Sequence, residues 1–161
     1  VMIAIALVLS PSLLIADEPT TALDVTIQAQ ILDLMLELKT RQQASAVLLI
    51  THNLAVVAET CDRVAVMYGG KIQEVASVGE LFSNPLHPYT RGLLASLPNV
   101  EGERQERLKT IPGSVPDIHN LPDGCKFVTR CNERFDPCAA TQPDLVEVGP
   151  GHLVRCHLYG S

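Results

Sequence analysis

Two adjacent carboxylates, Asp17 and Glu18, are the side chains of this sequence best suited to chemistry. They follow an apolar run at residues 13–16, whose short length and abrupt flanks predict a buried strand rather than a long helix. In an open parallel sheet, ligands bind beyond the carboxyl ends of the strands, so the pair would lie at the mouth of a site. Neighbouring carboxylates repel each other, and Mg²⁺ brought in with phosphates relieves that repulsion.

A second apolar segment, residues 46–50, leads to a histidine, His52. Between the two predicted strands, apolar residues recur at helical spacing and predict a helix over residues 26–43. If the strands are parallel, they form a right-handed crossover unit in which the carboxylates and His52 lie at adjacent strand ends. Carboxylate, metal and imidazole together suit phosphoryl transfer, which depends on positioning and on charge neutralisation.

The segment LLIADEPTTALD, residues 13–24, resembles the Walker B segment and D-loop of ABC-transporter ATPases, and AVLLITH, residues 46–52, resembles the strand before their switch histidine. The resemblance implies an α/β fold, the C-terminal part of a P-loop (RecA-like) ATPase domain. It also implies that Asp17 holds Mg²⁺, that Glu18 is the general base, and that His52 contacts the γ-phosphate of ATP. Asp24 would belong to the nucleotide site at the interface with a second ATPase domain.

Two hallmarks of that family do not occur in this sequence: a Gly-x-x-x-x-Gly-Lys-Ser/Thr phosphate loop and a Leu-Ser-Gly-Gly signature. In the family, the signature directly precedes a helix like the one predicted at residues 1–9. We therefore expect the C-terminal part of a longer ATPase, which would not hydrolyse ATP alone. The alternative is a non-catalytic docking module that carries the cysteines described below.

Further along the chain, we predict a short helix at residues 54–59, a hairpin turning at Gly69-Gly70, and another short helix at residues 78–82. We assign residues 1–84 to the ATPase domain and residues 85–161 to a small, irregular, cysteine-bearing extension. Its first part, NPLHPYTRGLLASLP, resembles the segment that follows the ATPase core in oligopeptide/dipeptide importers. This segment predicts a short helix between two prolines, and we interpret His87 as a packing or capping residue rather than a metal ligand. Residues 101–109 predict a charged helix or linker.

Four late cysteines are the second chemical signal: Cys125, Cys131, Cys138 and Cys156. The resemblance places them in the cytosol, where structural disulfides are rare and clustered cysteines favour a metal site. They lack the Cys-x-x-Cys pairs of a zinc ribbon, and four thiolates can equally hold a [4Fe–4S] cluster. Similarity to the cysteine-bearing C-terminal region of peptide-importer ATPases implies the cluster, while zinc and unligated thiols remain alternatives.

The surroundings of these cysteines support two expectations. Cationic neighbours should favour thiolates over thiols, and the candidates are Lys126, Arg130 and Arg134. His152 and His157 could replace a cysteine ligand. The region has few large apolar residues, so we expect it to bury little core and the metal to act as a structural staple.

Composition limits the classes of function. The formal net charge is −6, aromatic residues make up 4% of the sequence, and no basic cluster with interleaved aromatics occurs, so a nucleic-acid partner is not expected. The apolar start is interrupted by Pro11 and is too short to span a bilayer.

The resemblance implies the ATP-hydrolysing subunit of a dipeptide or oligopeptide importer, with nickel or another small solute as alternative cargo. Its implied partners are a second ATPase subunit, identical or different, transmembrane permease subunits and, indirectly, an extracytoplasmic peptide-binding protein. The implied location is the cytoplasmic face of the inner or plasma membrane.

Overall fold

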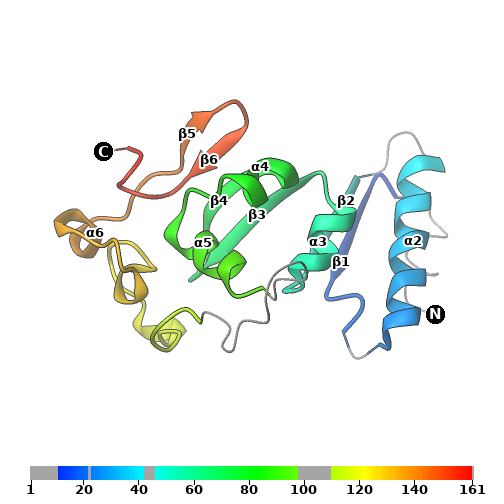
Figure 1. The fold of residues 1–161 in the computed structure, drawn as a ribbon, viewed down its shortest axis with the longest axis horizontal. Coiled ribbons are helices and arrows are strands. Elements are labelled where there is room, and N and C mark those ends of the chain that lie inside the picture. The colour runs from blue at the N-terminus through cyan, green and yellow to red at the C-terminus, as the bar shows by residue number, and fades with distance from the viewer. Residues whose placement is uncertain (1–10, 22, 42–45, 98–109, 161) are drawn as a thin grey trace, which may run out of the picture. The chain divides into compact units, whose positions relative to one another are not determined.

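The computed structural model describes residues 11–21, 23–41, 46–97 and 110–160, and the elements predicted at residues 1–9 and 101–109 lie outside these ranges. The chain divides into two compact units, Val1–Cys61 and Asp62–Ser161. Figure 1 shows the elements of each unit. The predicted domain boundary at residues 84/85 falls inside the second unit.

The first unit is built on two parallel strands, β1 (Leu13–Asp17) and β2 (Ala46–Ile50), so the condition set for the crossover unit is met. Their register places Asp17 opposite Ile50, so both strands end at the same edge. Helix α2 (Val25–Arg41) connects them, and α3 (Leu54–Thr60) follows β2. The Asn53 side chain accepts hydrogen bonds from the first turn of α3, as an N-cap residue does.

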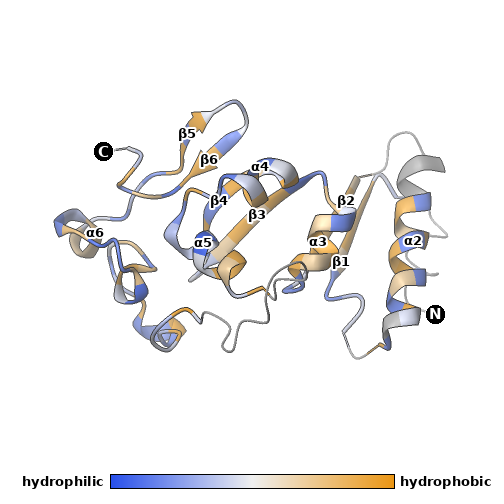
Figure 2. Ribbon diagram, viewed as in Figure 1, coloured by the Kyte–Doolittle hydropathy of each residue, from blue (hydrophilic) through white to orange (hydrophobic). Residues whose placement is uncertain are grey.

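Burial in the first unit is limited. Met35 of the predicted apolar stripe is buried, and so is its neighbour Leu32, whereas Leu34 is exposed. The two strands carry exposed large apolar side chains, namely Leu13, Ile15, Leu48 and Ile50. Figure 2 shows the apolar character of β1 and β2. The described part of this unit therefore leaves much of the apolar surface of its sheet uncovered.

The second unit contains an antiparallel sheet in the order β3 (Arg63–Tyr68), β4 (Lys71–Ser77), β6 (His152–Val154), β5 (Val146–Gly149). Gly69 and Gly70 have φ of 57° and 73°, as a two-residue type I′ turn between β3 and β4 requires. β6 pairs with β4, so the C-terminal hairpin extends the first hairpin. The prediction of an irregular extension is wrong here, because a valine-rich segment finds a sheet edge to pair with.

Short helices complete the second unit: α4 (Val78–Ser83), α5 (Pro88–Ala95), α6 (Asp136–Ala140), and the 3₁₀ turns Ile118–Asn120 and Val128–Arg130. The helices predicted after β4 and between the two prolines are confirmed. The Ser77 side chain caps α4, and the His87 side chain caps α5. No helix in the described ranges is long and apolar enough to cross a membrane.

An aromatic cluster joins the cysteine-bearing region to the rest of the second unit. Tyr68, Tyr89 and Phe127 have ring centroids 4.7–5.3 Å apart, and Phe127 is 2% exposed. Cys125 and Cys138 pack in the same cluster. The region was expected to bury little core of its own, and it shares one with β3 and α5.

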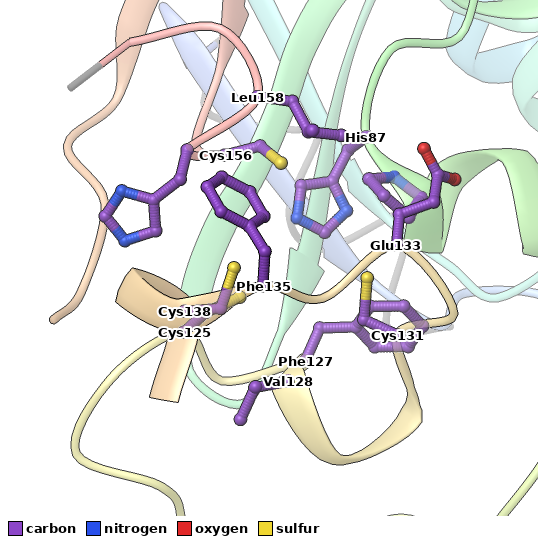
Figure 3. A pocket seen from close by; sticks show the side chains of 12 residues that line it. His87, Cys125, Phe127, Val128, Cys131, Glu133, Phe135, Cys138, Cys156 and Leu158 are labelled. Atoms are coloured by element: carbon purple, nitrogen blue, oxygen red, sulfur yellow. The ribbon is translucent and has the colours of Figure 1, made fainter. Parts of the chain in front are cut away.

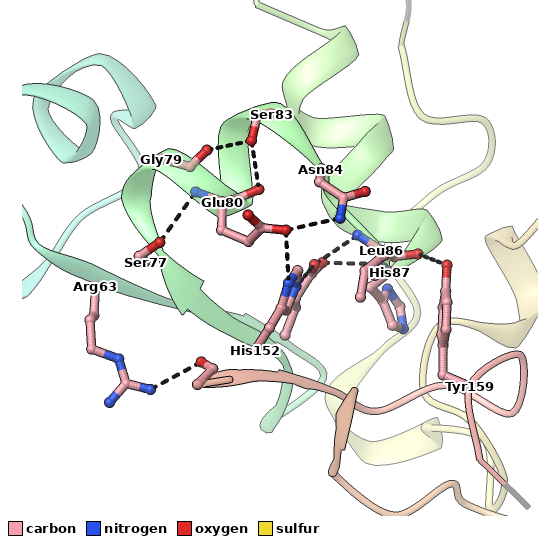
Figure 4. A network of polar contacts seen from close by, with 12 residues as sticks. Arg63, Ser77, Gly79, Glu80, Ser83, Asn84, Leu86, His87, His152 and Tyr159 are labelled. Carbon is pink, nitrogen blue, oxygen red and sulfur yellow. Dashed lines mark hydrogen bonds and ion pairs between the residues drawn. The ribbon is translucent and has the colours of Figure 1, made fainter. Parts of the chain in front are cut away.

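A buried carboxylate ties three further segments together. Glu74 of β4 is fully buried and accepts backbone hydrogen bonds from Leu86 at 2.8 Å and His87 at 3.0 Å. Its Oε1 also lies 2.8 Å from Nε2 of His152 on β6. The Nδ1 atom of His152 lies 3.7 Å from Oε1 of Glu80 of α4 (Figure 4). Every oxygen of Glu74 is thus bound, which makes its burial tolerable.

Candidate functional sites

The ends of β1 and β2 bring together two of the predicted site residues. Oε1 of Glu18 lies 2.9 Å from Nδ1 of His52, and Oε2 accepts a hydrogen bond of 2.8 Å from the Thr21 hydroxyl. The Glu18 backbone N–H donates to the Ile50 carbonyl at 2.9 Å, which continues the ladder between the strands. The parallel register therefore positions this pair directly.

Backbone and electrostatics both distinguish Glu18. Its φ is 43°, a left-handed conformation that a non-glycine residue adopts at a cost and that often marks functional turns. Hydrogen bonds from His52 and then Thr21 lower the pKa of the Glu18 carboxyl, so it is ionised at neutral pH. The side chains of Glu18 and His52 are 45% and 80% exposed, so both are open to a ligand from solvent.

The other two predicted residues of this site have different positions. Asp17 is exposed at the last position of β1. The Asp24 carboxylate accepts a hydrogen bond of 3.0 Å from the Ile27 N–H at the start of α2, so it acts as an N-cap. Sequence reasoning missed Thr21, and the available signal was a threonine three residues after a carboxylate in a turn.

The four late cysteines, distant in sequence, line one small cavity of about 10 Å³, which we call the thiol cavity. Figure 3 shows the sulfur atoms of Cys125 and Cys138 close together, with Cys131 and Cys156 on other sides of the same space. The Cys125 N–H donates to the Cys138 carbonyl at 2.8 Å, which fixes the backbones of these two residues. The fold therefore gathers the predicted donor set.

The surroundings of Cys125, Cys131 and Cys156 favour the protonated thiol. Burial, the largest cause, raises the pKa of Cys125 and Cys131, and raises that of Cys156 to about 11, with the neighbouring thiols adding to each shift. The expected thiolate stabilisation by cations is wrong for these three, because Lys126 and Arg130 bind backbone carbonyls instead. Within the described ranges, no group of three or more His, Cys, Asp or Glu side chains stands in metal-holding geometry.

Three histidines of this unit, His87, His152 and His157, each contact a partner within the fold. Nε2 of His152 lies 2.8 Å from Oε1 of Glu74, and Nε2 of His157 lies 2.8 Å from the Thr141 carbonyl oxygen. The Nε2 atom of each ring therefore has a partner within the protein. His87 is 1% exposed, lines the thiol cavity and accepts the Tyr89 N–H at Nδ1, which confirms its capping role. Burial lowers the pKa of His87 to about 4, so the ring is neutral at pH 7.

Comparison with known proteins finds a family match in the second unit. Residues 73–138 match the family described as "Oligopeptide/dipeptide transporter, C-terminal region". This match runs from β4 to Cys138 and so includes His87 and three of the four cysteines. The chain is also similar in sequence to proteins named as peptide or oligopeptide transport ATP-binding proteins.

Particular relatives align along nearly the whole chain. The oligopeptide transport ATP-binding protein AppD of Bacillus subtilis (strain 168) is 57% identical over 99% of the chain and 48% of its own length. The probable peptide ABC transporter ATP-binding protein y4tR of Sinorhizobium fredii is 56% identical over 96% and 46%. The oligopeptide transport ATP-binding protein OppD of Escherichia coli (strain K12) is 49% identical over 97% and 45%. The chain thus spans about half the length of these relatives.

Proposed function

We propose that this chain forms part of the ATP-binding and ATP-hydrolysing subunit of an ABC-type importer of dipeptides or oligopeptides. The observation that carries the proposal is the 2.9 Å contact between Glu18 and His52 at the ends of two parallel strands, next to Asp17. The names of the relatives support the transported class, since they are peptide and oligopeptide transport proteins.

Each residue has a separate task in this proposal. Asp17 would hold Mg²⁺, which neutralises phosphate charge when bound. The ionised Glu18 would accept a proton from the attacking water and orient it. An ionised carboxylate can only accept, so Nδ1 of His52 would donate to Glu18. A proton on Nε2 would then let the ring contact the γ-phosphate. The phosphate loop that completes the site does not occur in this sequence and would come from the part of the relatives that this chain does not match.

The proposal places the subunit within a larger assembly. Asp24 would lie near a second ATPase subunit, and the nucleotide would bind between the two. Transmembrane permease subunits would hold the ATPases at the cytoplasmic face of the membrane, and an extracytoplasmic binding protein would deliver the peptide. The exposed apolar side chains of β1 and β2 would pack, in the intact subunit, against the segment that corresponds to the unmatched half of the relatives.

The test uses Glu18→Gln in the intact ATP-binding subunit. We expect ATP binding to persist and steady-state hydrolysis to stop, because glutamine keeps the shape of the side chain and cannot accept the proton. Glu59→Gln is the matched control, since Glu59 is exposed on α3 in the same unit, and it should hydrolyse ATP like the wild type. Wild-type turnover in Glu18→Gln would exclude Glu18 as the base and favour a non-catalytic docking module.

We further propose that Cys125, Cys131, Cys138 and Cys156 hold a [4Fe–4S] cluster. Four sulfur donors converge on one cavity, and the neighbouring thiols contribute to the raised pKa values of Cys125, Cys131 and Cys156, an effect that a bound cation reverses. The Nε2 atom of His87, which also lines this cavity, is buried and has no hydrogen-bond partner. The sulfur atoms of a bound cluster would offer it an acceptor. The side chains must rearrange around the cluster, which would staple the extension to the sheet.

Iron, sulfide and zinc quantified in anaerobically purified protein test this assignment. We expect about four irons per chain, loss of iron in Cys138→Ser, and no loss in Cys61→Ser, whose cysteine lies outside the thiol cavity. One zinc per chain without iron would contradict the cluster and favour a zinc site at the four cysteines. Chelation of iron that leaves residues 110–160 as protease-resistant as before would overturn the structural role.

A further inference from the structure

A groove of about 440 Å³ in the second unit is lined by α4, by the segment that follows it and by the β5–β6 hairpin. This volume is in the range of small-molecule sites. None of the described residues that line the groove is lysine or arginine, and one of them is a glutamate, so the groove suits a cation better than an anion. Its lining includes Glu80, Asn84, Leu86, Val148, His152 and Tyr159.

His152 lines this groove although it is only 5% exposed, and its two ring nitrogens face different carboxylates. Nε2 lies 2.8 Å from Oε1 of Glu74, which also accepts two backbone N–H groups. Because an ionised carboxylate only accepts, the hydrogen of this contact belongs to Nε2. Nδ1 lies 3.7 Å from Oε1 of Glu80, which is beyond hydrogen-bond distance. Figure 4 shows the His152 ring turned toward the Glu80 carboxylate.

This arrangement leaves two acceptors facing each other. With the hydrogen on Nε2, Nδ1 of the neutral His152 ring presents a lone pair. The Glu80 carboxylate also only accepts, and Oε1 already binds Nδ2 of Asn84 at 2.9 Å. The contacts that Glu80 makes within the described ranges use Oε1, which leaves Oε2 available. A nearly buried acceptor without a donor costs free energy, so a ligand that donates to both groups would be stabilised here.

The acceptors and the remaining walls limit the chemistry of such a ligand. In the part of the chain that the structure describes, no set of three or more His, Cys, Asp or Glu side chains is arranged to hold a metal ion. A primary ammonium group instead brings three N–H donors and one positive charge. Leu86, Val148 and Tyr159 offer apolar surface beside the acceptors, and the Tyr159 hydroxyl is held by the Leu86 carbonyl at 3.1 Å. An ammonium group on a short apolar chain therefore matches both parts of the groove.

We propose that this groove binds a primary ammonium ion carried on a short apolar chain, with the ammonium group between Glu80 and Nδ1 of His152. Glu80 supplies the charge, and His152 supplies an acceptor at a fixed position. Glu74 takes no ligand itself and is a positioning residue, because it keeps the hydrogen of His152 on Nε2. The site shares no residue with the Glu18–His52 pair, so it does not rest on the proposed ATPase function.

The test is an NMR titration of the intact ATP-binding subunit with n-butylammonium, and with n-butanol as a neutral probe of similar shape. The ¹³C-labelled methyl groups of Leu86 and Val148 report on the groove, since both residues line it. We expect butylammonium to shift these signals saturably and butanol to bind about tenfold more weakly, because only the ammonium group makes charged hydrogen bonds. Equal binding of the two probes would overturn the proposal without the need for a variant.

Two substitutions test the role of the carboxylate. Glu80→Gln keeps the length of the side chain and removes its charge, so we expect butylammonium to bind about tenfold more weakly. Asp144→Asn is the matched control, because Asp144 is exposed in the same unit and does not line the groove, and it should bind like the wild type. Unchanged binding in Glu80→Gln would contradict the site. Ring ¹⁵N signals that show His152 protonated at both nitrogens in the free subunit would also overturn it, since Nδ1 would then donate to Glu80 without a ligand.

Discussion

Each of the two units contains a Glu–His pair. The nitrogen–oxygen distance is nearly the same in the two pairs, whereas the exposure of their side chains differs. In the first unit, Glu18 and His52 lie 2.9 Å apart with side chains 45% and 80% exposed. In the second, Glu74 and His152 lie 2.8 Å apart with side chains 0% and 6% exposed. The same contact therefore occurs once at an open strand edge and once inside a sheet.

The surroundings of each pair, rather than the contact, indicate its task. Glu74 is saturated by two backbone N–H groups and His152, so it holds segments together and has no capacity for a ligand. The oxygens of Glu18 are bound only by exposed side chains, which a ligand can displace, and an exposed pair contributes little to stability. The open pair is thus suited to chemistry and the buried pair to structure.

Removing each glutamate in turn should give the largest difference in stability between the two pairs. Glu74→Ala leaves two backbone N–H groups and His152 without their acceptor, and we expect the second unit to lose about 3–5 kcal/mol. Glu18→Ala should leave stability unchanged within error. Hydrogen exchange of the β4 and β6 amides, read by mass spectrometry, measures the local opening free energy in both variants. Equal protection in the two variants would show that burial does not distinguish the pairs.

A second, smaller effect tests the tight packing that surrounds the thiol cavity. A Cβ added at Gly124 would meet the Cys138 and Ala139 carbonyl oxygens at 2.4 and 2.6 Å. Gly124→Ala must therefore displace α6 from Cys125, and we expect a loss of about 1–3 kcal/mol in denaturant unfolding together with reduced iron uptake.

Gly79→Ala is the matched control for this substitution, because a Cβ there meets nothing within 4 Å. It should be neutral or slightly stabilising, since alanine is the better helix former in α4. Equal stability of the two alanine variants would contradict the close approach at Gly124.

Local signals in the sequence explain what could be predicted. The apolar runs of β1 and β2, the Gly69-Gly70 turn and Asn53 before α3 each act within a few residues, and these elements lie where the sequence predicts them. The sequence also predicted that Glu18 and His52 lie at adjacent strand ends if the strands are parallel, as they are, but it did not predict their direct contact. A mixed α/β fold and the neighbourhood of these two residues were therefore accessible without coordinates.

Long-range contacts explain what could not be predicted. Glu74 in the sequence KIQEVAS has the pattern of an ordinary strand glutamate, and its partner His152 lies far along the chain. The pairing of β6 with β4 likewise joins segments that lie far apart in the sequence. The four cysteines could be counted but not placed around His87, because their cavity forms only when the aromatic cluster packs.

A third prediction concerns Asp24, which the first unit uses as a cap and the proposed function uses at an interface. Asp24→Ala should lower the stability of α2 by about 1 kcal/mol, whereas Asp24→Asn should keep it, because asparagine caps as well as aspartate. Circular dichroism during thermal unfolding measures the difference. If Asp24→Asn keeps stability but reduces ATP hydrolysis in the intact subunit, the charge acts beyond the cap; full activity would limit Asp24 to capping.

The smallest effect lies in the open pair itself. The hydrogen bond from His52 is the largest cause that lowers the pKa of Glu18, followed by that from Thr21. His52→Ala should therefore raise the pKa of Glu18 toward its usual value, and Thr21→Val should raise it less. Since a lowered carboxyl pKa favours the ionised form, the contact is present above that usual pKa and is lost as the pH falls through the folded value. Titration of the Glu18 carboxyl carbon by NMR measures the shift, and an unchanged pKa in His52→Ala would mean that the exposed pair is broken in solution before any ligand arrives.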